Sequence, residues 1–215
     1  MNIDKIMRII RAYDDWVVRA YCTGRFGILR QRFLDEIGQY LPEEGDVVDV
    51  GCGIGLFSLY YAQLFPQLQI HGLDLNPNRV QMAQKAAARM GLGNVHYEVA
   101  SAVGFAADGS LSGAYILDVI HHIPQDAVRP LVEEIHRSLL PGGRLLIKDV
   151  DTSPAYKRIF THALDLAMDP KAPVRYWSSE ELPALLRDVG FEVHRHAMVD
   201  FLPYPHILYI CTKAG

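Results

Sequence analysis

The chain has 215 residues, of which 50% are hydrophobic and 21% charged, with a formal net charge of −4. This apolar content is enough for one full hydrophobic core and argues against a long disordered region. The acidic balance argues against a broad nucleic-acid-binding surface, although it leaves room for a local basic patch. Three cysteines far apart in sequence do not form a disulfide framework. Charges interrupt residues 1–16, so we expect these residues to be neither a signal peptide nor a membrane span. We therefore expect a cytoplasmic protein.

Apolar residues at helical spacing predict two amphipathic helices at the start of the chain, over residues 3–21 and 26–40. The second is expected to stop at Leu41 and Pro42. Basic residues beside the first apolar stripe would suit contact with an anionic membrane or an acidic carrier protein, but acidic neighbours favour an ordinary solvated face. These basic residues are Lys5, Arg8, Arg11 and Arg19.

From residue 45 the pattern changes to strands alternating with helices. Strands apolar on both faces predict a mainly parallel sheet covered on both sides. The expected strands are 47–50, 68–74, 94–100, 113–120 and 144–151, and the expected helices are 54–65, 77–91 and 125–140.

After Asp151 we expect a helix over residues 155–168, then a loop, then a second helix over 178–190. Ser178 and Glu181 form a capping-box pattern for this second helix, and Gly190 would close it. The strands expected at 191–199 and 206–213 are joined by a short connection, which favours an antiparallel pair. No internal repeat or second domain is evident, so residues 1–215 are interpreted as one domain.

Glycines at positions 51, 53 and 55 follow a strand and open a helix. Backbone amides and the positive end of the helix dipole would therefore face one ligand, which could carry a phosphate or a carboxylate. The spacing is neither G-x-G-x-x-G nor a P-loop. Asp74 closes the next strand, roughly twenty residues further on, where a carboxylate can accept both hydroxyls of a ribose. A nucleoside with an anionic end is favoured over the alternative, a tight turn followed by a solvated aspartate.

Four segments resemble, in sequence and in order, the motifs of class I S-adenosylmethionine-dependent methyltransferases of the small-molecule type. These segments are VVDVGCGIG, GLDLN, YILDVIHHI and LLPGGRLLIKD. The resemblance implies an α/β, Rossmann-like, seven-stranded, mostly parallel sheet of order 3-2-1-4-5-7-6 with an antiparallel last pair. It also implies S-adenosyl-L-methionine as cofactor. The domain would then comprise an N-terminal helical lid (1–41), a cofactor-binding core (45–151), a lid insertion (152–177) and a C-terminal helix with the strand pair (178–215).

The resemblance also assigns cofactor contacts by position. Ser101 departs from the family pattern, which usually has Asp or Asn there to accept from the adenine amino group. Cys52 is interpreted as a small loop residue and not as a nucleophile. The implied contacts are Asp49, Gly51, Cys52, Gly53 and Gly55 for the methionine end, Asp74 for the ribose, Leu75, Ser101 and Ala102 for the adenine, and Asp118 at the methyl-transfer site.

Methyl transfer from a sulfonium is an in-line displacement that depends mainly on positioning and desolvation. A hydroxyl acceptor would also need a base. His122 is the first choice, with His121 and Asp149 as further candidates, although the histidines could simply pack near the cofactor. No residue set has convincing metal-ligand spacing.

The aromatic residues of segments 1–41 and 152–177 favour a small, apolar or aromatic acceptor, with oxygen slightly favoured as the methylated atom, and no nucleic acid partner. Two alternatives stay open, a non-catalytic cofactor-binding protein and an enzyme acting on a lipid or carrier-bound intermediate. The oligomeric state is undetermined.

Overall fold

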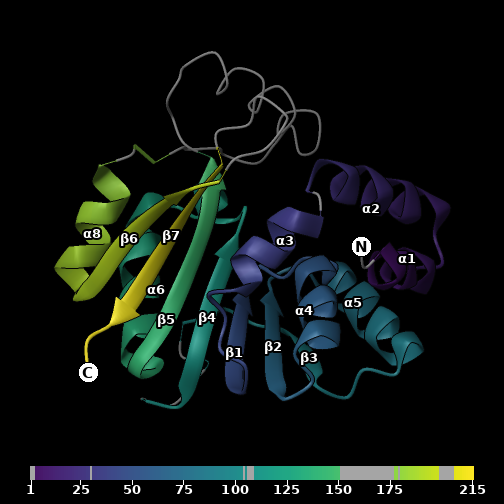
Figure 1. Cartoon of the computed structure of the whole chain (residues 1–215), viewed down its shortest axis with the longest axis horizontal. Helices are drawn as coiled ribbons and strands as arrows, with labels where there is room; N and C mark the ends of the chain where they lie inside the picture. The colour runs from purple at the N-terminus through teal and green to yellow at the C-terminus, as the bar shows by residue number, and fades with distance from the viewer. Residues whose placement is uncertain are drawn as a thin grey trace.

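One seven-stranded sheet organises the protein, with strand order β3-β2-β1-β4-β5-β7-β6 (Figure 1). The computed structural model describes residues 3–29, 31–103, 105, 109–150, 177–178, 180–198 and 206–215. The strands are β1 (Gly45–Val50), β2 (Leu68–Asp74), β3 (Val95–Val99), β4 (Leu111–Leu117), β5 (Leu139–Val150), β6 (Phe191–Ala197) and β7 (His206–Lys213).

Strand pairing confirms the predicted architecture. β3, β2, β1, β4 and β5 are parallel, whereas β7 pairs antiparallel with both β5 and β6. β5 begins earlier than predicted, because the segment before Arg144 continues the strand through an irregularity in its pairing with β4. The helix predicted at 155–168 and nearly all of the lid insertion lie outside the described residues.

Helices cover both faces of the sheet, as its two-sided apolar strands require (Figure 1). Successive β1 residues divide between two cores, with Val47 in one and Val48 in the other. The helices are α1 (Ile3–Ala12), α2 (Trp16–Ile28), α3 (Gln31–Gly38), α4 (Leu56–Leu64), α5 (Pro77–Met90), the short 3₁₀ helix η1 (Ile120–His122), α6 (Gln125–Ser138) and α8 (Glu181–Val189).

The first 40 residues form three helices, so the prediction of two continuous helices is wrong. The first predicted helix is interrupted because Asp15 leaves the helical conformation and caps α2, its side chain accepting from the amide of Val17 at 2.7 Å. The second is interrupted where α2 ends, at the bond from the Leu29 amide to the Arg25 carbonyl. Apolar residues recur at helical spacing on both sides of each break, so spacing alone could not reveal the breaks.

The basic side chains of the N-terminal segment mostly bind the protein itself. Lys5 donates to the carbonyl of Gln63 at 2.8 Å, near the end of α4, and Arg8 donates to that of Met90 at 3.1 Å, at the end of α5. Cations at helix C-termini satisfy carbonyls that lack an intrahelical partner and complement the helix dipole. Arg19 similarly donates to the carbonyl of Tyr13 at 2.6 Å. These residues therefore anchor the N-terminal helices.

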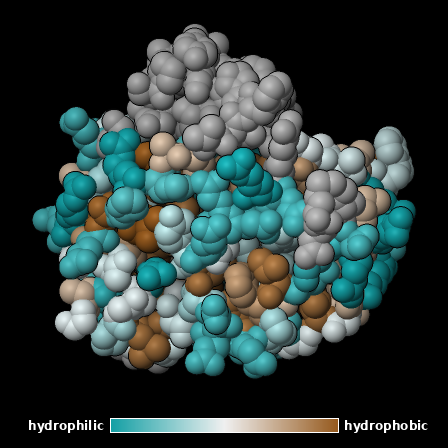
Figure 2. Space-filling view, viewed as in Figure 1, coloured by the Kyte–Doolittle hydropathy of each residue, from teal (hydrophilic) through white to brown (hydrophobic). Residues whose placement is uncertain are grey.

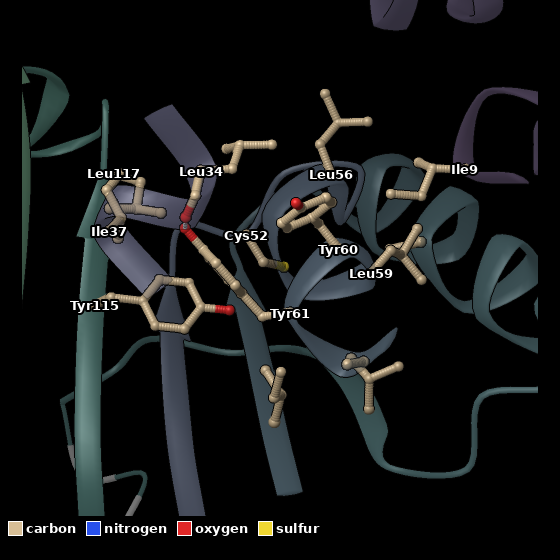
Figure 3. Close-up of a cluster of buried hydrophobic side chains, with 14 of the residues drawn as sticks. Ile9, Leu34, Ile37, Cys52, Leu56, Leu59, Tyr60, Tyr61, Tyr115 and Leu117 are labelled. Atoms are coloured by element: carbon tan, nitrogen blue, oxygen red, sulfur yellow. Dashed lines mark hydrogen bonds between the residues drawn. The ribbon is translucent and has the colours of Figure 1, made fainter. Parts of the chain in front are cut away.

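The N-terminal helices pack on α4 through an aromatic cluster. The Tyr60 hydroxyl donates to Asp35 at 2.6 Å, and the Tyr61 hydroxyl donates to the Leu34 carbonyl at 3.1 Å. These bonds fix α3 against the helix that follows the glycine loop. Figure 3 shows the surrounding buried side chains, which include Ile9, Leu34, Ile37, Leu56, Leu59 and Tyr115.

Hydrophilic residues cover most of the described surface in the view of Figure 2, with smaller hydrophobic areas between them. Among the residues that the structure describes, no helix has the length and apolar character needed to cross a membrane.

The capping box predicted before α8 is present. The Glu181 amide donates to Ser178 Oγ at 3.0 Å, and the Ser178 amide donates to Glu181 Oε2 at 3.4 Å. At its other end, α8 is closed by Gly190 in the left-handed conformation, with φ of 113°.

We expect Ser178→Ala to lower the free energy of unfolding by about 1 kcal/mol, because the Glu181 amide loses its acceptor. Urea denaturation of both proteins measures this difference. Ser178→Thr keeps a hydroxyl and serves as the control; an equal loss in both variants would contradict a capping role.

Candidate functional site

The glycine loop between β1 and α4 lies at the carboxyl end of the sheet. Gly51, Gly53 and Gly55 all adopt positive φ values, of 75°, 56° and 89°, which L-residues with a side chain rarely adopt. The amides of Gly51 and Cys52 donate to the Leu73 carbonyl at 2.8 and 3.0 Å, which ties the loop to the end of β2. The left-handed Gly55 then starts α4 without a side-chain cap.

The loop glycines differ in what surrounds them. A Cβ on Gly51 would lie 2.5 Å from a methyl group of Val119, and one on Gly55 would lie 2.6 Å from the Tyr97 hydroxyl. A Cβ on Gly53 would have no neighbouring protein atom within 4 Å. Gly51 and Gly55 are therefore required for packing, whereas Gly53 borders open space that a ligand can occupy.

Asp74 lies beside this open space and is held by backbone amides. Its Oδ2 accepts from the Gly53 amide at 2.9 Å, and its Oδ1 accepts from the Asn76 amide at 2.8 Å. An ionised carboxylate has about four lone-pair positions, so both oxygens retain acceptor capacity. This fixed orientation suits a pair of neighbouring hydroxyls such as those of a ribose.

Asp49 is the deeply buried carboxyl of the site, with 2% exposure. Burial raises its pKa to about 7, the nearby Ser58 and Tyr115 hydroxyls oppose this shift, and the Asp74 charge adds to it. Its Oδ2 atom has no hydrogen-bond partner among the described residues. A buried acceptor without a donor is costly in a folded protein, and the ammonium of a ligand's methionine end would satisfy it.

The predicted adenine side lies beyond the ends of β2 and β3, which are adjacent in the sheet. Leu75 is 76% exposed and Val103 is 52% exposed, and exposed apolar groups of this size suit a flat aromatic ligand. Ser101 Oγ accepts from the Val103 amide at 3.2 Å, so its hydroxyl shapes this turn. Ala102 packs against the core formed with α6 and α8.

Cys52 is buried within the loop, and its burial, together with the charges of Asp49 and Asp74, raises the pKa of its thiol far above the ordinary value. A thiol that stays protonated is a poor nucleophile. The surroundings of Cys52 therefore do not favour a nucleophilic thiol.

Tyr13, one of the aromatic residues of the predicted N-terminal lid, contacts the glycine loop, and this contact was not predicted from the sequence. Its hydroxyl donates to the Ile54 carbonyl at 2.8 Å, and the ring is buried. The segment between α1 and α2 therefore touches the loop directly. In the sequence, Tyr13 was one position in a helical stripe and one aromatic residue of the predicted lid, and nothing local indicated a bond to the loop.

The predicted base candidates come together where β4 and β5 end. His121 Nδ1 lies 2.6 Å from Asp149 Oδ1, and both side chains are almost fully buried. Because an ionised carboxylate can only accept, Nδ1 carries the hydrogen and Nε2 is the basic nitrogen. The His122 ring lies beside it, with centroids 4.1 Å apart. The three candidates thus form one group.

Asp118 lies at the end of β4, as predicted, and is bound by two cations. Arg25 of α2 and the buried Lys148 of β5 both form ion pairs with its carboxylate. Burial would raise the pKa of Asp118, but the charges of Lys148 and Arg25 outweigh it and hold that pKa well below its usual range. Neither cation was predicted from the sequence, although a lysine within an apolar strand was a signal for Lys148.

Within the described ranges, no group of three or more His, Cys, Asp or Glu side chains is arranged to hold a metal ion. The open space at Gly53, the unsatisfied oxygen of Asp49 and the oriented Asp74 carboxylate fit the methionine and ribose ends of S-adenosylmethionine.

Comparisons with known proteins agree with this geometry. Residues 47–143 match the family described as "Methyltransferase domain". The chain is 30% identical over 172 residues to the O-methyltransferase resE of Aspergillus sclerotiorum, covering 77% of this chain and 62% of that protein. It is 31% identical over 159 residues to a ubiquinone biosynthesis O-methyltransferase of Xanthomonas axonopodis pv. citri, covering 71% and 64%. The chain thus spans slightly less than two thirds of either relative.

A solved structure of a SAM-dependent methyltransferase from Methanosarcina mazei superposes with a TM-score of 0.67 at 23% identity. The superposition covers 83% of this chain and 97% of the other. At this identity the likeness supports the fold.

We expect Gly53→Ala to weaken the binding of S-adenosylhomocysteine at least tenfold while costing only about 1–2 kcal/mol of stability, from its positive φ. Gly51→Ala adds a clash with Val119 and is expected to cost about 2–4 kcal/mol. Gly91→Ala, with φ of 65° and open surroundings at the end of α5, is the control for backbone strain. Calorimetric titration and thermal unfolding separate the effects. Equal affinity in the Gly53 and Gly91 variants would contradict the assignment.

Cofactor affinity is expected to rise with pH up to about pH 7 and then level off. Free Asp49 is protonated below its pKa of about 7, and a ligand ammonium favours the ionised form, so binding releases a proton. The stability of the ligand-free protein changes with pH in the opposite direction. The contribution of Asp49 to the free energy of unfolding is greatest below the unfolded-state pKa of 3.8 and declines as the pH rises towards 7. Titration in buffers of different ionisation enthalpy measures the proton release, which Asp49→Asn is expected to abolish.

Proposed function

We propose that this chain, which belongs to the class I S-adenosylmethionine-dependent methyltransferases, methylates a hydroxyl oxygen of a small, apolar or aromatic molecule. The buried hydrogen bond between His121 and Asp149 supports oxygen as the acceptor atom, because it would provide a base. A hydroxyl acceptor must lose a proton during methyl transfer, whereas a neutral amine need not. Two relatives at about 30% identity are named O-methyltransferases, which supports the same choice.

The cofactor supplies an electrophilic methyl group on a sulfonium. On the side of the protein, the open space at Gly53 would receive the methionine end, and Asp49 would accept from its ammonium. Asp74, already oriented by two amides, would accept from the ribose hydroxyls. Leu75 would pack on the adenine, with Ser101 and Ala102 at its edge.

His121 would take the proton of the acceptor hydroxyl on Nε2. Asp149 accepts from Nδ1 and stabilises the imidazolium that forms. This arrangement supports His121 as the base in preference to His122, whose ring would line the site beside it. A phenolic hydroxyl, with a pKa near 10, is a better match for an imidazole base than an aliphatic alcohol.

Residues 1–41 would act as a lid over this site. Tyr13 contacts the glycine loop and Arg25 contacts Asp118, so the N-terminal segment reaches both the cofactor side and the acceptor side. A cover that excludes water favours methyl transfer, because the sulfonium loses its charge in the transition state.

We expect His121→Gln to lower kcat about 10²- to 10⁴-fold, the range for loss of a general base, without changing the affinity for S-adenosylhomocysteine. Asp149→Asn should lower kcat in the same direction, since it disturbs the tautomer of His121. Transfer of a labelled methyl group to a panel of phenols, aliphatic alcohols and amines measures turnover and identifies the acceptor atom. His194→Gln, an exposed histidine of β6, is the control.

Undiminished phenol turnover in His121→Gln would contradict the role of the base. Cofactor binding without transfer to any acceptor would instead favour a non-catalytic cofactor-binding protein.

A further inference from the structure

The ion-pair cluster of Arg25, Asp118 and Lys148 joins parts of the chain that are distant in sequence. Arg25 and Asp118 are 93 residues apart, and Lys148 and Asp118 are 30 apart. The Lys148 side chain is 1% exposed and its ammonium lies 5.3 Å from the centre of the Phe33 ring of α3. The cluster therefore connects α2, α3 and the ends of β4 and β5.

Asp118 is constrained in its backbone as well as in its side chain. Its φ is 58°, and among the residues that the structure describes it is the only non-glycine residue with a positive φ. Its amide donates to the Lys148 carbonyl at 3.0 Å, while the Lys148 ammonium binds its carboxylate. This double attachment to β5 fixes the direction in which the carboxylate points, towards α2.

Stability alone does not explain such a cluster. Buried ion pairs are often no more stabilising than apolar residues of the same size, because the charges lose their hydration. A carboxylate held this rigidly, in a conformation that is uncommon for a side-chain-bearing residue, points to a positional role.

Within the described part of the chain, α2 has few buried apolar side chains, and Arg19 links it to the Tyr13 carbonyl. Of its side chains, Cys22 and Phe26 are buried, whereas Trp16 is 77% exposed, Val17 53% and Tyr21 38%. Gly24 and Gly27 have open surroundings. The Arg25 side chain, 27% exposed, reaches from this loosely packed helix to the end of β4. The position of α2 at this end of the sheet is visible in Figure 1.

We propose that Arg25 is a positioning residue for the methyl acceptor: through its ion pair with Asp118, which Lys148 holds in place, it keeps α2 closed over the end of the sheet where His121 and Asp149 lie. This proposal rests on the proposed function. Since Arg25 acts on the helix and not on the glycine loop, it would govern the binding of the acceptor and leave the binding of the cofactor unchanged.

The experiment compares Arg25→Met, Arg25→Lys and, as a control, Arg11→Met, which removes an exposed cation from the neighbouring α1. We expect Arg25→Met to raise the KM for the acceptor at least tenfold, with kcat changed less than threefold and S-adenosylhomocysteine affinity unchanged. Arg25→Lys should recover most of the acceptor KM, because it keeps the charge. Arg11→Met should match the wild type.

Amide hydrogen exchange of α2 provides a readout that does not depend on turnover. Exchange over residues 16–28 should quicken at least tenfold in Arg25→Met and stay near the wild-type rate in Arg25→Lys. Unchanged exchange and an unchanged KM in Arg25→Met would overturn the proposal, as would equal loss of cofactor affinity. If the wild-type protein methylates no acceptor, the proposed function fails and the acceptor role with it; exchange would still decide whether Arg25 holds α2.

Discussion

The parallel pairing of β1 with β2 and β4 is the constraint on which the site depends. Because parallel strands all end at one edge, their terminal residues are brought together however far apart they lie in sequence. Bonds between neighbouring strand ends then fix the loops that follow. The Gly51 amide binds the Leu73 carbonyl, the Gly53 amide binds Asp74, and the Asp118 amide binds the Lys148 carbonyl. The site is therefore an extension of the sheet.

This edge concentrates carboxyl groups, and each is accommodated by different means. Asp74 is held by amides, Asp149 is paired with His121, and Asp118 is neutralised by cations, whereas Asp49 lies in surroundings that favour its protonated form. Without such compensation, carboxylates buried this closely would repel one another and lose hydration. A ligand that carries an ammonium and a sulfonium would add positive charge to this edge and so would suit this group of carboxyl groups.

Local patterns predicted most of the elements and a mainly parallel sheet, because alternating strands and helices, the glycine loop and the capping box of Ser178 each involve only a few neighbouring residues. The strand order was implied by the family resemblance. Contacts between distant residues were beyond such patterns. The break at Asp15 was hidden because apolar spacing continued on both sides of it. Arg25 was indistinguishable from any other basic residue of an amphipathic helix until the fold brought it to Asp118. Lys148 stood out in an apolar strand, but nothing local identified its partner.

The N-terminal segment links the two halves of the proposed site physically. Tyr13 binds the loop at Ile54, next to the glycine that borders the ligand space, and Arg25, one helix later, binds the end of β4. The segment is therefore attached at two separate points, Tyr13 on the cofactor side and Arg25 on the acceptor side. Because the sheet itself is rigidly paired, variation in such an added segment can change the acceptor without disturbing the residues that hold the cofactor. In this chain the residues at the strand ends would bind the cofactor and support methyl transfer, and the N-terminal helices would determine which molecule is methylated.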